Sequence, residues 1–499
     1  MIRRIVSAAA IASLTACSLA PPYVRPEAPV PPSWPVGDAY LRSSEAALPT
    51  VRYQDIFRDT RLQTLIAQAL ANNRDLRVAA ANIAIARGQY HVQRAELLPE
   101  VDANAGVTAR NGQTTTSNGA GGATTNRTTT SSFDATLGIT SFELDLFGRV
   151  RSLTSEAQNR YFATEAAARA TRLTMVGDIA TGWLQYAADK SLLKIAQDTA
   201  TSAAKTVDLT QKRLNGGIAP RTDLRQAQLT LDTAQADVAQ QTTAVAQDVN
   251  ALQLLVGAPI DPTLLPNSID EAVATIAELP AGLDSSVLLR RPDVVEAEYT
   301  LRAANADIGA ARAELFPKIT LTGLLGFASN ALGALFGGGA FNWSAGANAS
   351  YPIFRAGAGR ANVAVSKAQR DLALAQYEKA IQTAFREVSD ALARRGTMSA
   401  QLTATRNQRD AAADYYKLSD ERYRGGIDSF LDSLVAQRSF YSAQQTLVNT
   451  QLIQASNLVT LYRVLGGDSL VEANKSGPQP LSPDPAPIDR PTGTATPRP

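Results

Sequence analysis

The chain contains almost no residues of the kinds that build catalytic or metal centres. Its 499 residues include one histidine, His91, and one cysteine, Cys17. A protein zinc site needs several such ligands together, so the sequence predicts no metal site and no cofactor apart from a covalent lipid. The triple glycine at 337–339 lacks the strand–helix context and the following lysine of a phosphate-binding loop. We therefore expect a protein that is not an enzyme.

Aromatic residues and net charge are scarce as well. Aromatics make up 6% of the chain, and the formal net charge is +2. No basic cluster with interleaved aromatics occurs, so the sequence predicts no nucleic-acid partner. Beyond the N-terminal segment, no stretch reaches 18 uninterrupted apolar residues, which argues against a transmembrane helix.

The chain begins with a targeting segment. Residues 1–16 contain two arginines, then an apolar run and small residues, which is typical of a signal peptide. The sequence Leu14-Thr15-Ala16-Cys17 looks like a bacterial lipobox, in which the Cys17 thiol is lipidated and becomes the mature N-terminus. The alternative is ordinary secretory cleavage that leaves a spare thiol. We predict a lipidated, proline-rich and extended tether at 17–55.

The remainder of the chain is a tandem duplication. RAELLPEV at 94–101 returns as RAELFPKI at 312–319, and RLNGGIAPRTDLRQAQ at 213–228 returns as RYRGGIDSFLDSLVAQ at 422–437. Repeats this long are duplicated domains rather than solenoid units. We predict a first repeat at 56–260, a linker at 261–290, a second repeat at 291–470 and a disordered proline-rich tail at 471–499.

Each repeat predicts a helix, a two-stranded hairpin and two long helices. The Gly/Thr/Asn-rich stretch at 111–130 is predicted as a loop. Apolar residues recur every seven positions, as in Ile179, Tyr186 and Leu193, which is coiled-coil spacing. Helices of about 65 residues are about 100 Å long and need partner helices along their length. The helices are expected at about 72–97, 150–214, 221–256, 292–315, 358–424 and 429–465, and the strands at about 100–109, 132–143, 317–327 and 341–352.

All four predicted strands alternate apolar and polar residues. In FNWSAGANASY at 341–351 the alternation is unbroken. Strands of about ten residues, when tilted, cross a bilayer's hydrocarbon layer, and terminal aromatics fit its interfaces. The polar face would then line a water-filled lumen. The candidate interface aromatics are Phe133, Phe341, Trp343 and Tyr351.

A soluble β-sandwich or hairpin cap also has alternating strands. Four isolated strands, however, have open edges, which a membrane forbids. Several subunits must therefore share one closed barrel, with eight strands from a dimer, twelve from a trimer, or more. Because a helix enters and leaves each hairpin, both hairpin loops lie on one side of the membrane and the helices on the other.

Together these features resemble the TolC-like outer-membrane efflux proteins, specifically the lipoprotein outer-membrane factors of resistance–nodulation–division pumps, NodT-type branch. The resemblance is carried by the lipobox, RAELLPEV and RAELFPKI, FELDLFGRVRS, LRRPDVVEAEYTLRAANADIGAARAELFPKITL at 289–321 and RYRGGIDSFLDSLVAQRSFYSAQ at 422–444. It implies a mainly α fold with a membrane β-barrel. Long helical hairpins would form a trimeric α-barrel in the periplasm, and four strands per chain would contribute to a shared twelve-stranded barrel in the Gram-negative outer membrane.

The resemblance also implies partners and a function. A homotrimer would act with a periplasmic adaptor protein and an inner-membrane pump, and small molecules would leave by passive passage through an exit duct. The turns after the long helices would form the tip that docks the adaptor. These tip residues are Gly216, Gly217, Ile218, Gly425, Gly426 and Ile427.

A periplasmic aperture is expected just beyond the second turn. Leu431 matches a hydrophobic constriction residue of the family. Asp428 and Asp432 are expected one helical turn apart on one helix face, and three copies would make a cation-favouring carboxylate ring held by a neighbouring arginine, Arg422 or Arg438. Alternatively, both acids are simply solvated. Relatives often carry an acid at the position of Val435, so this chain departs from the family there.

Two other functions fit the same elements. The same duct would also serve protein secretion, although the lipobox and the RRPDV phrase favour small-molecule efflux. A lipid-anchored periplasmic coiled-coil scaffold without a pore would keep the helices, but it would not need four strands of bilayer length.

Overall fold

The computed structural model describes residues 18–35, 37, 39–40, 52–118, 122–277, 285–474 and 476–479. The predicted signal peptide and Cys17 lie outside the described residues. The chain divides into two compact units, which we name by their content. The sheet unit is Met1–Val24, Ala84–Tyr161 and Tyr299–Ala375, and the hairpin unit is Arg25–Ile83, Phe162–Glu298 and Gln376–Pro499.

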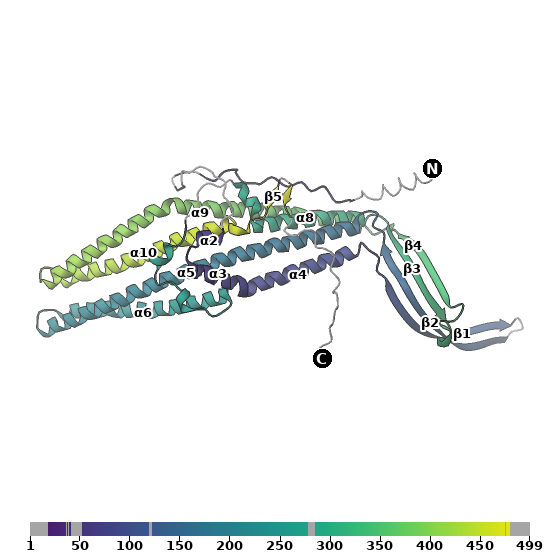
Figure 1. The fold of residues 1–499 in the computed structure, drawn as a ribbon, viewed down its shortest axis with the longest axis horizontal. Helices are drawn as coiled ribbons and strands as arrows, with labels where there is room; N and C mark the ends of the chain where they lie inside the picture. The colour runs from purple at the N-terminus through teal and green to yellow at the C-terminus, as the bar shows by residue number, and fades with distance from the viewer. Residues whose placement is uncertain are drawn as a thin grey trace, which may run out of the picture. The chain divides into compact units, whose positions relative to one another are not determined.

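The long helices repeat in length between the two halves of the chain (Figure 1). Helices α4 (Arg74–Ala95) and α8 (Pro292–Ala313) have 22 residues each, and α5 (Arg149–Asn215) and α9 (Ala358–Arg424) have 67 each. Helices α6 (Arg221–Val256) and α10 (Phe430–Val464) have 36 and 35. All six lie within two residues of their predicted ends, so the predicted helices are confirmed.

Several members of the seven-residue apolar stripes are buried, as coiled-coil packing requires. Ile179, Tyr186 and Leu193 on α5 and Leu434 and Val448 on α10 are each less than a tenth exposed. Helix-to-helix packing within the hairpin unit therefore supplies the partner surfaces that helices of this length need.

Short elements precede and join the two repeats. Helices α2 (Tyr53–Ile56) and α3 (Thr60–Asn72) come before α4. The segment predicted as a linker contains the 3-10 turns η2 (Pro262–Leu264) and η3 (Ser285–Arg290) and the short helix α7 (Ile269–Val273). This segment is folded rather than a plain spacer.

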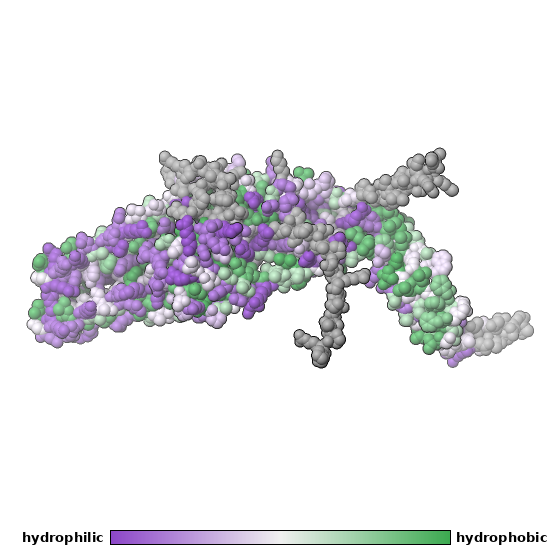
Figure 2. Space-filling view, viewed as in Figure 1, coloured by the Kyte–Doolittle hydropathy of each residue, from purple (hydrophilic) through white to green (hydrophobic). Residues whose placement is uncertain are grey.

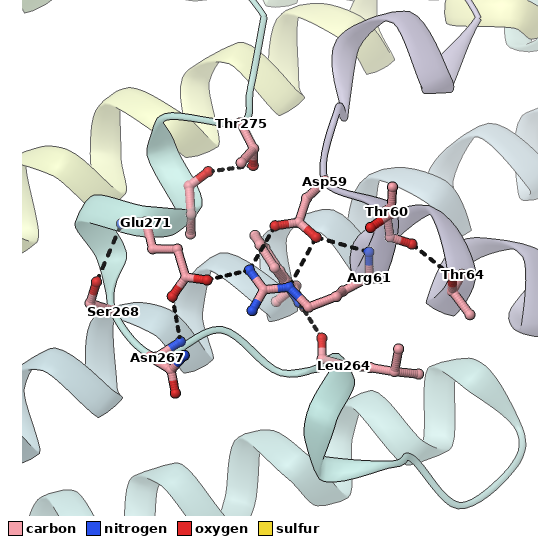
Figure 3. A network of polar contacts seen from close by, with 11 residues as sticks. Asp59, Thr60, Arg61, Thr64, Leu264, Asn267, Ser268, Glu271 and Thr275 are labelled. Atoms are coloured by element: carbon pink, nitrogen blue, oxygen red, sulfur yellow. Dashed lines mark hydrogen bonds and ion pairs between the residues drawn. The ribbon is translucent and has the colours of Figure 1, made fainter.

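A polar network fastens α3 to the segment between the repeats (Figure 3). Asp59 caps α3 by accepting a hydrogen bond from the backbone N–H of Arg61 at 2.8 Å. The Arg61 guanidinium pairs with Asp59 at 2.8 Å and with Glu271 of α7 at 2.6 Å. Trp183 of α5 donates to the carbonyl of Leu264 at 3.1 Å. The network therefore holds the inter-repeat segment against both α3 and α5.

Four strands form one antiparallel sheet in the order β1-β2-β3-β4 (Figure 1). They are β1 (Asp102–Asn118), β2 (Gly122–Glu143), β3 (Lys318–Ser329) and β4 (Phe341–Ser350), and the turn η4 (Leu332–Ala334) lies between the last two. The first and last strands of this order, β1 and β4, are the edges of the sheet.

The loop predicted at 111–130 is wrong for most of its length. The ladder between β1 and β2 continues from Asp102 opposite Gly138 to Asn118 opposite Gly122. Threonine is β-branched and favours strands, and a ribbon with water on both faces needs no apolar alternation. The Thr-rich composition therefore extends the hairpin instead of interrupting it.

The predicted disorder of the tail is wrong for its first residues. Turn η5 (Gly467–Ser469) leads into a small hairpin of β5 (Ala473–Asn474) and β6 (Gly477–Pro478). The backbone N–H of Val471, which is buried, donates to the carbonyl of Arg290 at 2.9 Å. Residues 480–499 lie outside the described part of the chain.

The N-terminal tether has no helix or strand over residues 18–35, in agreement with an extended segment. In the sheet unit, α8 holds it by two hydrogen bonds, from Asn305 to the carbonyl of Pro21 at 2.8 Å and from Arg312 to the carbonyl of Leu19 at 2.9 Å. In the hairpin unit, Arg25 pairs with the buried carboxylate of Glu298 at 2.7 Å. The described part of the tether is therefore held at Leu19, Pro21 and Arg25.

Candidate functional site: the two-faced sheet and the hairpin turns

The strand register gives the sheet one continuous apolar face. Residues directly opposite each other on antiparallel strands point to the same face. Leu137 lies opposite Leu325, and Leu325 lies opposite Trp343. The odd-numbered residues of these strands therefore point to the same face of the sheet. The apolar face comprises Ala103, Ala105, Val107, Phe133, Ala135, Leu137, Ile139, Ile319, Leu321, Leu325, Phe327, Phe341, Trp343, Ala345, Ala347 and Ala349.

The opposite face is polar, with Leu324 as its main exception. It carries Asn104, Thr108, Asp134, Thr136, Lys318, Thr320, Thr322, Asn342, Ser344 and Asn348. Figure 2 shows hydrophobic residues gathered over the strands and hydrophilic residues over the long helices. One face of this sheet is chemically suited to lipid and the other to water.

A β-bulge keeps the apolar face intact near the end of β2. Between the pairs Ile139–Gly323 and Phe142–Leu321, β2 advances three residues while β3 advances two. The extra residue shifts Phe142 onto the face of Leu321 and sends Glu143 to the polar side, where it pairs with Lys318 at 2.9 Å. The sequence TSFEL gives no alternation that predicts this shift.

The predicted interface aromatics lie on or next to the apolar face. Phe341, Trp343 and Tyr351 have exposed fractions of 58%, 68% and 56% in the single chain, and Phe133 is half-buried. Phe341 also contacts Phe327 edge-to-face, with ring centroids 5.8 Å apart. Large exposed aromatics on one face are expected where a bilayer, rather than protein, covers them.

The two turns after α5 and α9 have the same backbone conformation. Gly217 and Gly426 are left-handed, with φ of +72° and +75°. The next N–H in each turn reaches back five residues, from Ile218 to the carbonyl of Arg213 and from Ile427 to that of Arg422, each at 2.9 Å. This Schellman geometry requires a glycine and explains the duplicated Gly-Gly-Ile sequence.

The turns present isoleucines to solvent. Ile218 and Ile427 are 74% and 68% exposed in the single chain. Solvent-exposed apolar residues at the same place in both repeats favour contact with another protein.

The predicted aperture acids have different surroundings. Asp428 lies in the turn ahead of α10, and Arg422 binds it in a bidentate ion pair at 2.6 and 2.8 Å, which lowers the pKa of Asp428. Asp432 accepts hydrogen bonds from the N–H and hydroxyl of Ser429 in a capping box. The expectation that both acids lie on one helix face is wrong, because Asp428 precedes the helix.

The two helical hairpins are joined near the turns. The guanidinium of Arg213 lies 4.7 Å from the centre of the Tyr423 ring, and Tyr423 packs with Phe430 and Leu434 in a buried cluster. Further along, the Tyr441 hydroxyl of α10 donates to Asp237 of α6 at 2.7 Å. These are links within one chain, and the sequence periodicity alone did not predict them.

A groove of about 930 Å³ lies between α6 and α10. Leu431, Val435 and Arg438, three residues of the predicted aperture region, line it together with Leu229. Leu431 is 54% exposed, so its side chain is available to a further surface.

The described residues contain no cluster of three metal-ligating side chains, and none of their helices is long and apolar enough to span a membrane. His91 packs beside Tyr90 on α4, with ring centroids 5.6 Å apart.

A family model described as outer membrane efflux protein matches residues 65–258 and 283–467. The chain belongs to the outer membrane efflux protein family. The resemblance predicted from the motifs is thereby confirmed, together with the outer-membrane location and the channel fold of alternating long helical hairpins and strand pairs.

Named relatives of this efflux protein cover nearly its whole length. It is 44% identical over 461 residues to the probable efflux pump outer membrane protein TtgC of Pseudomonas putida, covering 91% of this chain and 93% of that one. It is 43% identical over 470 residues to the solvent efflux pump outer membrane protein SrpC of Pseudomonas putida, covering 93% and 98%. The open state of the Neisseria gonorrhoeae MtrE outer membrane channel superposes with a TM-score of 0.79 at 35% identity, covering 91% and 99%.

Proposed function

We propose that this efflux protein is the exit duct of a tripartite efflux system and that it works as a homotrimer. The observation that carries the proposal is the single four-stranded sheet with one apolar and one polar face and two open edges. Three such sheets close a twelve-stranded barrel with lipid outside and water inside. The duct makes and breaks no bond, so a partner must supply the energy.

The partners are an adaptor protein in the periplasm and an inner-membrane resistance–nodulation–division pump. The repeated exposed isoleucines of the two turns, Ile218 and Ile427, support adaptor docking at Gly216–Ile218 and Gly425–Ile427. The substrates are small apolar molecules. The names of relatives, which include a solvent efflux pump protein, favour this class over exported proteins.

The lipid anchor on Cys17 belongs to the same proposal. Leu19, two residues after Cys17, is held by Arg312 near the end of α8, and the membrane strand β3 begins five residues after α8 ends, at Lys318. A lipid on Cys17 is therefore tethered near the base of the sheet. Phe133, Phe341, Trp343 and Tyr351 would lie in the two membrane interfaces.

The test is susceptibility in the native host. Deletion of the gene is expected to lower the minimum inhibitory concentration of apolar antibiotics and solvents at least several-fold, and plasmid-borne wild type to restore it. A Gly217→Asp/Gly426→Asp variant strains both turns and is expected to lose adaptor docking. Gly88→Asp, on exposed α4, is its control. Lost protein secretion with unchanged drug susceptibility would contradict the proposal.

A further inference from the structure

The two hairpins of the sheet end in tips of opposite chemistry. In the first hairpin, residues 108–132 contain no apolar side chain larger than alanine and include two arginines. In the second, residues 329–340 read SNALGALFGGGA, which has no charged residue and contains Leu332, Leu335 and Phe336. Because β2 and β3 pair antiparallel, both tips lie at the same end of the sheet. The side of the membrane on which a tip lies therefore does not explain the difference.

Ring contacts place this apolar loop, residues 330–340, against the apolar face of the sheet. The Phe336 ring packs edge-to-face on Phe327, with ring centroids 5.4 Å apart. Phe327 belongs to the apolar face, and it lies opposite Phe341 in the β3–β4 ladder. Leu335 is buried, so the middle of the loop packs back on the chain. The loop therefore folds over the apolar side of its own hairpin rather than over the polar side.

The apolar loop extends the exposed apolar surface of the sheet. Leu332 is 66% exposed and Phe336 is 75% exposed. Together with Phe341 they put three large, exposed apolar side chains at one end of the apolar face. Apolar side chains that continue a lipid-facing surface are expected to share its cover.

The apolar loop satisfies part of its own backbone. Four of its N–H groups donate to carbonyls within the loop at 3.0 to 3.3 Å, namely those of Ala334, Leu335, Gly337 and Ala340. The N–H of Ala328 closes the hairpin by donating to the carbonyl of Ala340 at 2.9 Å. A hydrogen-bonded backbone enters an apolar layer at a lower cost than an open one, and the membrane interface leaves water within reach of the remaining groups.

We propose that the apolar loop is a membrane clip, which inserts Leu332 and Phe336 among the acyl chains of the leaflet away from the helices. This inference rests on the proposed duct, which puts the apolar face of the sheet in lipid. Phe327 and Phe341 form the last rung of the β3–β4 ladder, so the contact of Phe336 with Phe327 sets the loop at the height of the outer interface. The clip holds the second hairpin tip away from the mouth of the lumen.

The contacts and the composition of the loop favour lipid as its cover. A loop that closed the lumen would contact the polar face, whereas Phe336 contacts a residue of the apolar face. A loop surrounded by water would have the polar composition of the first tip. Uncharged, apolar side chains beside interfacial aromatics match the boundary between headgroups and acyl chains.

Fluorescence quenching measures what covers the loop. Leu332→Cys is labelled with an environment-sensitive fluorophore in the full-length protein, which is then reconstituted in phosphatidylcholine vesicles. The quencher is either a spin label on the lipid acyl chain or iodide in the water. We expect the lipid-borne quencher to reduce the emission of the label at least threefold more than iodide does. The wild type, whose one cysteine is Cys17, gives the labelling background.

Three further label sites calibrate the measurement. Ala347→Cys, in the apolar face, should be quenched from lipid, and Asn342→Cys, in the polar face, should be quenched by iodide. Thr128→Cys, on the exposed first tip, should also be quenched by iodide.

A matched pair of substitutions tests the anchoring side chain. Phe336→Asp should move the Leu332 label from the lipid-quenched to the iodide-quenched class, because a carboxylate stays in water. Phe336→Leu keeps an apolar side chain and should leave the label quenched from lipid. Equal quenching of the label in both variants would overturn the role of Phe336.

The outcomes separate the clip from the duct. A Leu332 label that is quenched by iodide, when the Ala347 label is quenched from lipid, puts the loop in water and overturns the clip alone. A Leu332 label that neither quencher reaches is covered by protein, such as a partner subunit, and this also overturns the clip. An Ala347 label that lipid does not quench in the inserted protein overturns the proposed function as well.

Discussion

Asp248 on α6 is a carboxyl whose protonation depends on its surroundings. Burial and the neighbouring Asp189 carboxyl of α5 raise the pKa of Asp248 to about 7. A folded pKa above the unfolded value of about 3.9 means that the protonated acid stabilises the fold at low pH. This stabilisation is complete below about pH 4 and is lost as the pH rises through about 7.

The Asp248→Asn variant should remove this pH dependence. We expect it to unfold at a temperature a few degrees higher than wild type at pH 8, equivalent to about 1–2 kcal/mol because the site is only partly buried. Circular dichroism melts from pH 4 to pH 8 measure this. Asp232→Asn, exposed on the same helix, is the control. An unchanged slope in Asp248→Asn would contradict the assignment.

The two acids after the second turn should separate into electrostatic and structural roles. Asp432→Ala removes the capping box of α10 and should cost about 1 kcal/mol of stability, whereas Asp428→Ala should leave stability nearly unchanged. In planar bilayers Asp428→Ala, not Asp432→Ala, should lower cation selectivity. Asp223→Ala, at the matching position of the first repeat, is the stability control. Equal loss of selectivity in both variants would instead support a carboxylate ring formed by both acids.

Some residue roles were predictable from sequence and some were not. The glycines of both turns follow from duplicated motifs and helix-end geometry. The partner of Tyr441 did not, because Asp237 lies 204 residues away and a local pattern carries no information on such a contact. The separation of Asp428 from Asp432 depends on where α10 begins, and helix ends are the least certain feature of a sequence pattern.

At the scale of elements, the two faces of the sheet should respond differently to the same change. Ala347→Lys puts a charge on the apolar face, which costs about 2–4 kcal/mol at the bilayer midplane, while Asn348→Lys puts it on the polar face. We expect loss of outer-membrane trimer for the first and near-normal trimer for the second, measured on fractionated membranes by heat-modifiable gel mobility. Equal loss in both would contradict the assignment of faces.

The element ranges show which signals a sequence carries. The long helices were predicted within two residues because glycine turns, proline stops and heptad spacing mark their ends. The strand extension through the Thr-rich stretch was missed, since a two-sided polar ribbon has no alternation to detect. The bulge at Ile139–Phe142 was missed because its only trace in the sequence is that the apolar-face position changes from an odd-numbered to an even-numbered residue.

At the scale of the whole molecule, duplication explains both the fold and the sheet of only four strands, whose two edges stay open in one chain. Two repeats place two helical hairpins and two strand pairs in one chain, and the chain's own β2–β3 junction shows how consecutive repeats join. The sequence predicted the channel family from its motifs, and the family match confirmed it. The number of copies was not predictable from strand counting, which allows a dimer or a trimer.

Single-channel conductance in planar bilayers tests the central claim most directly. The purified protein is compared with a variant in which α5–α6 and α9–α10 are shortened equally on both sides of their turns. We predict small, cation-selective steps for the full-length protein and much larger steps for the shortened one. The absence of conductance from both, when each is folded and inserted as a trimer, would contradict a duct and favour a scaffold without a pore.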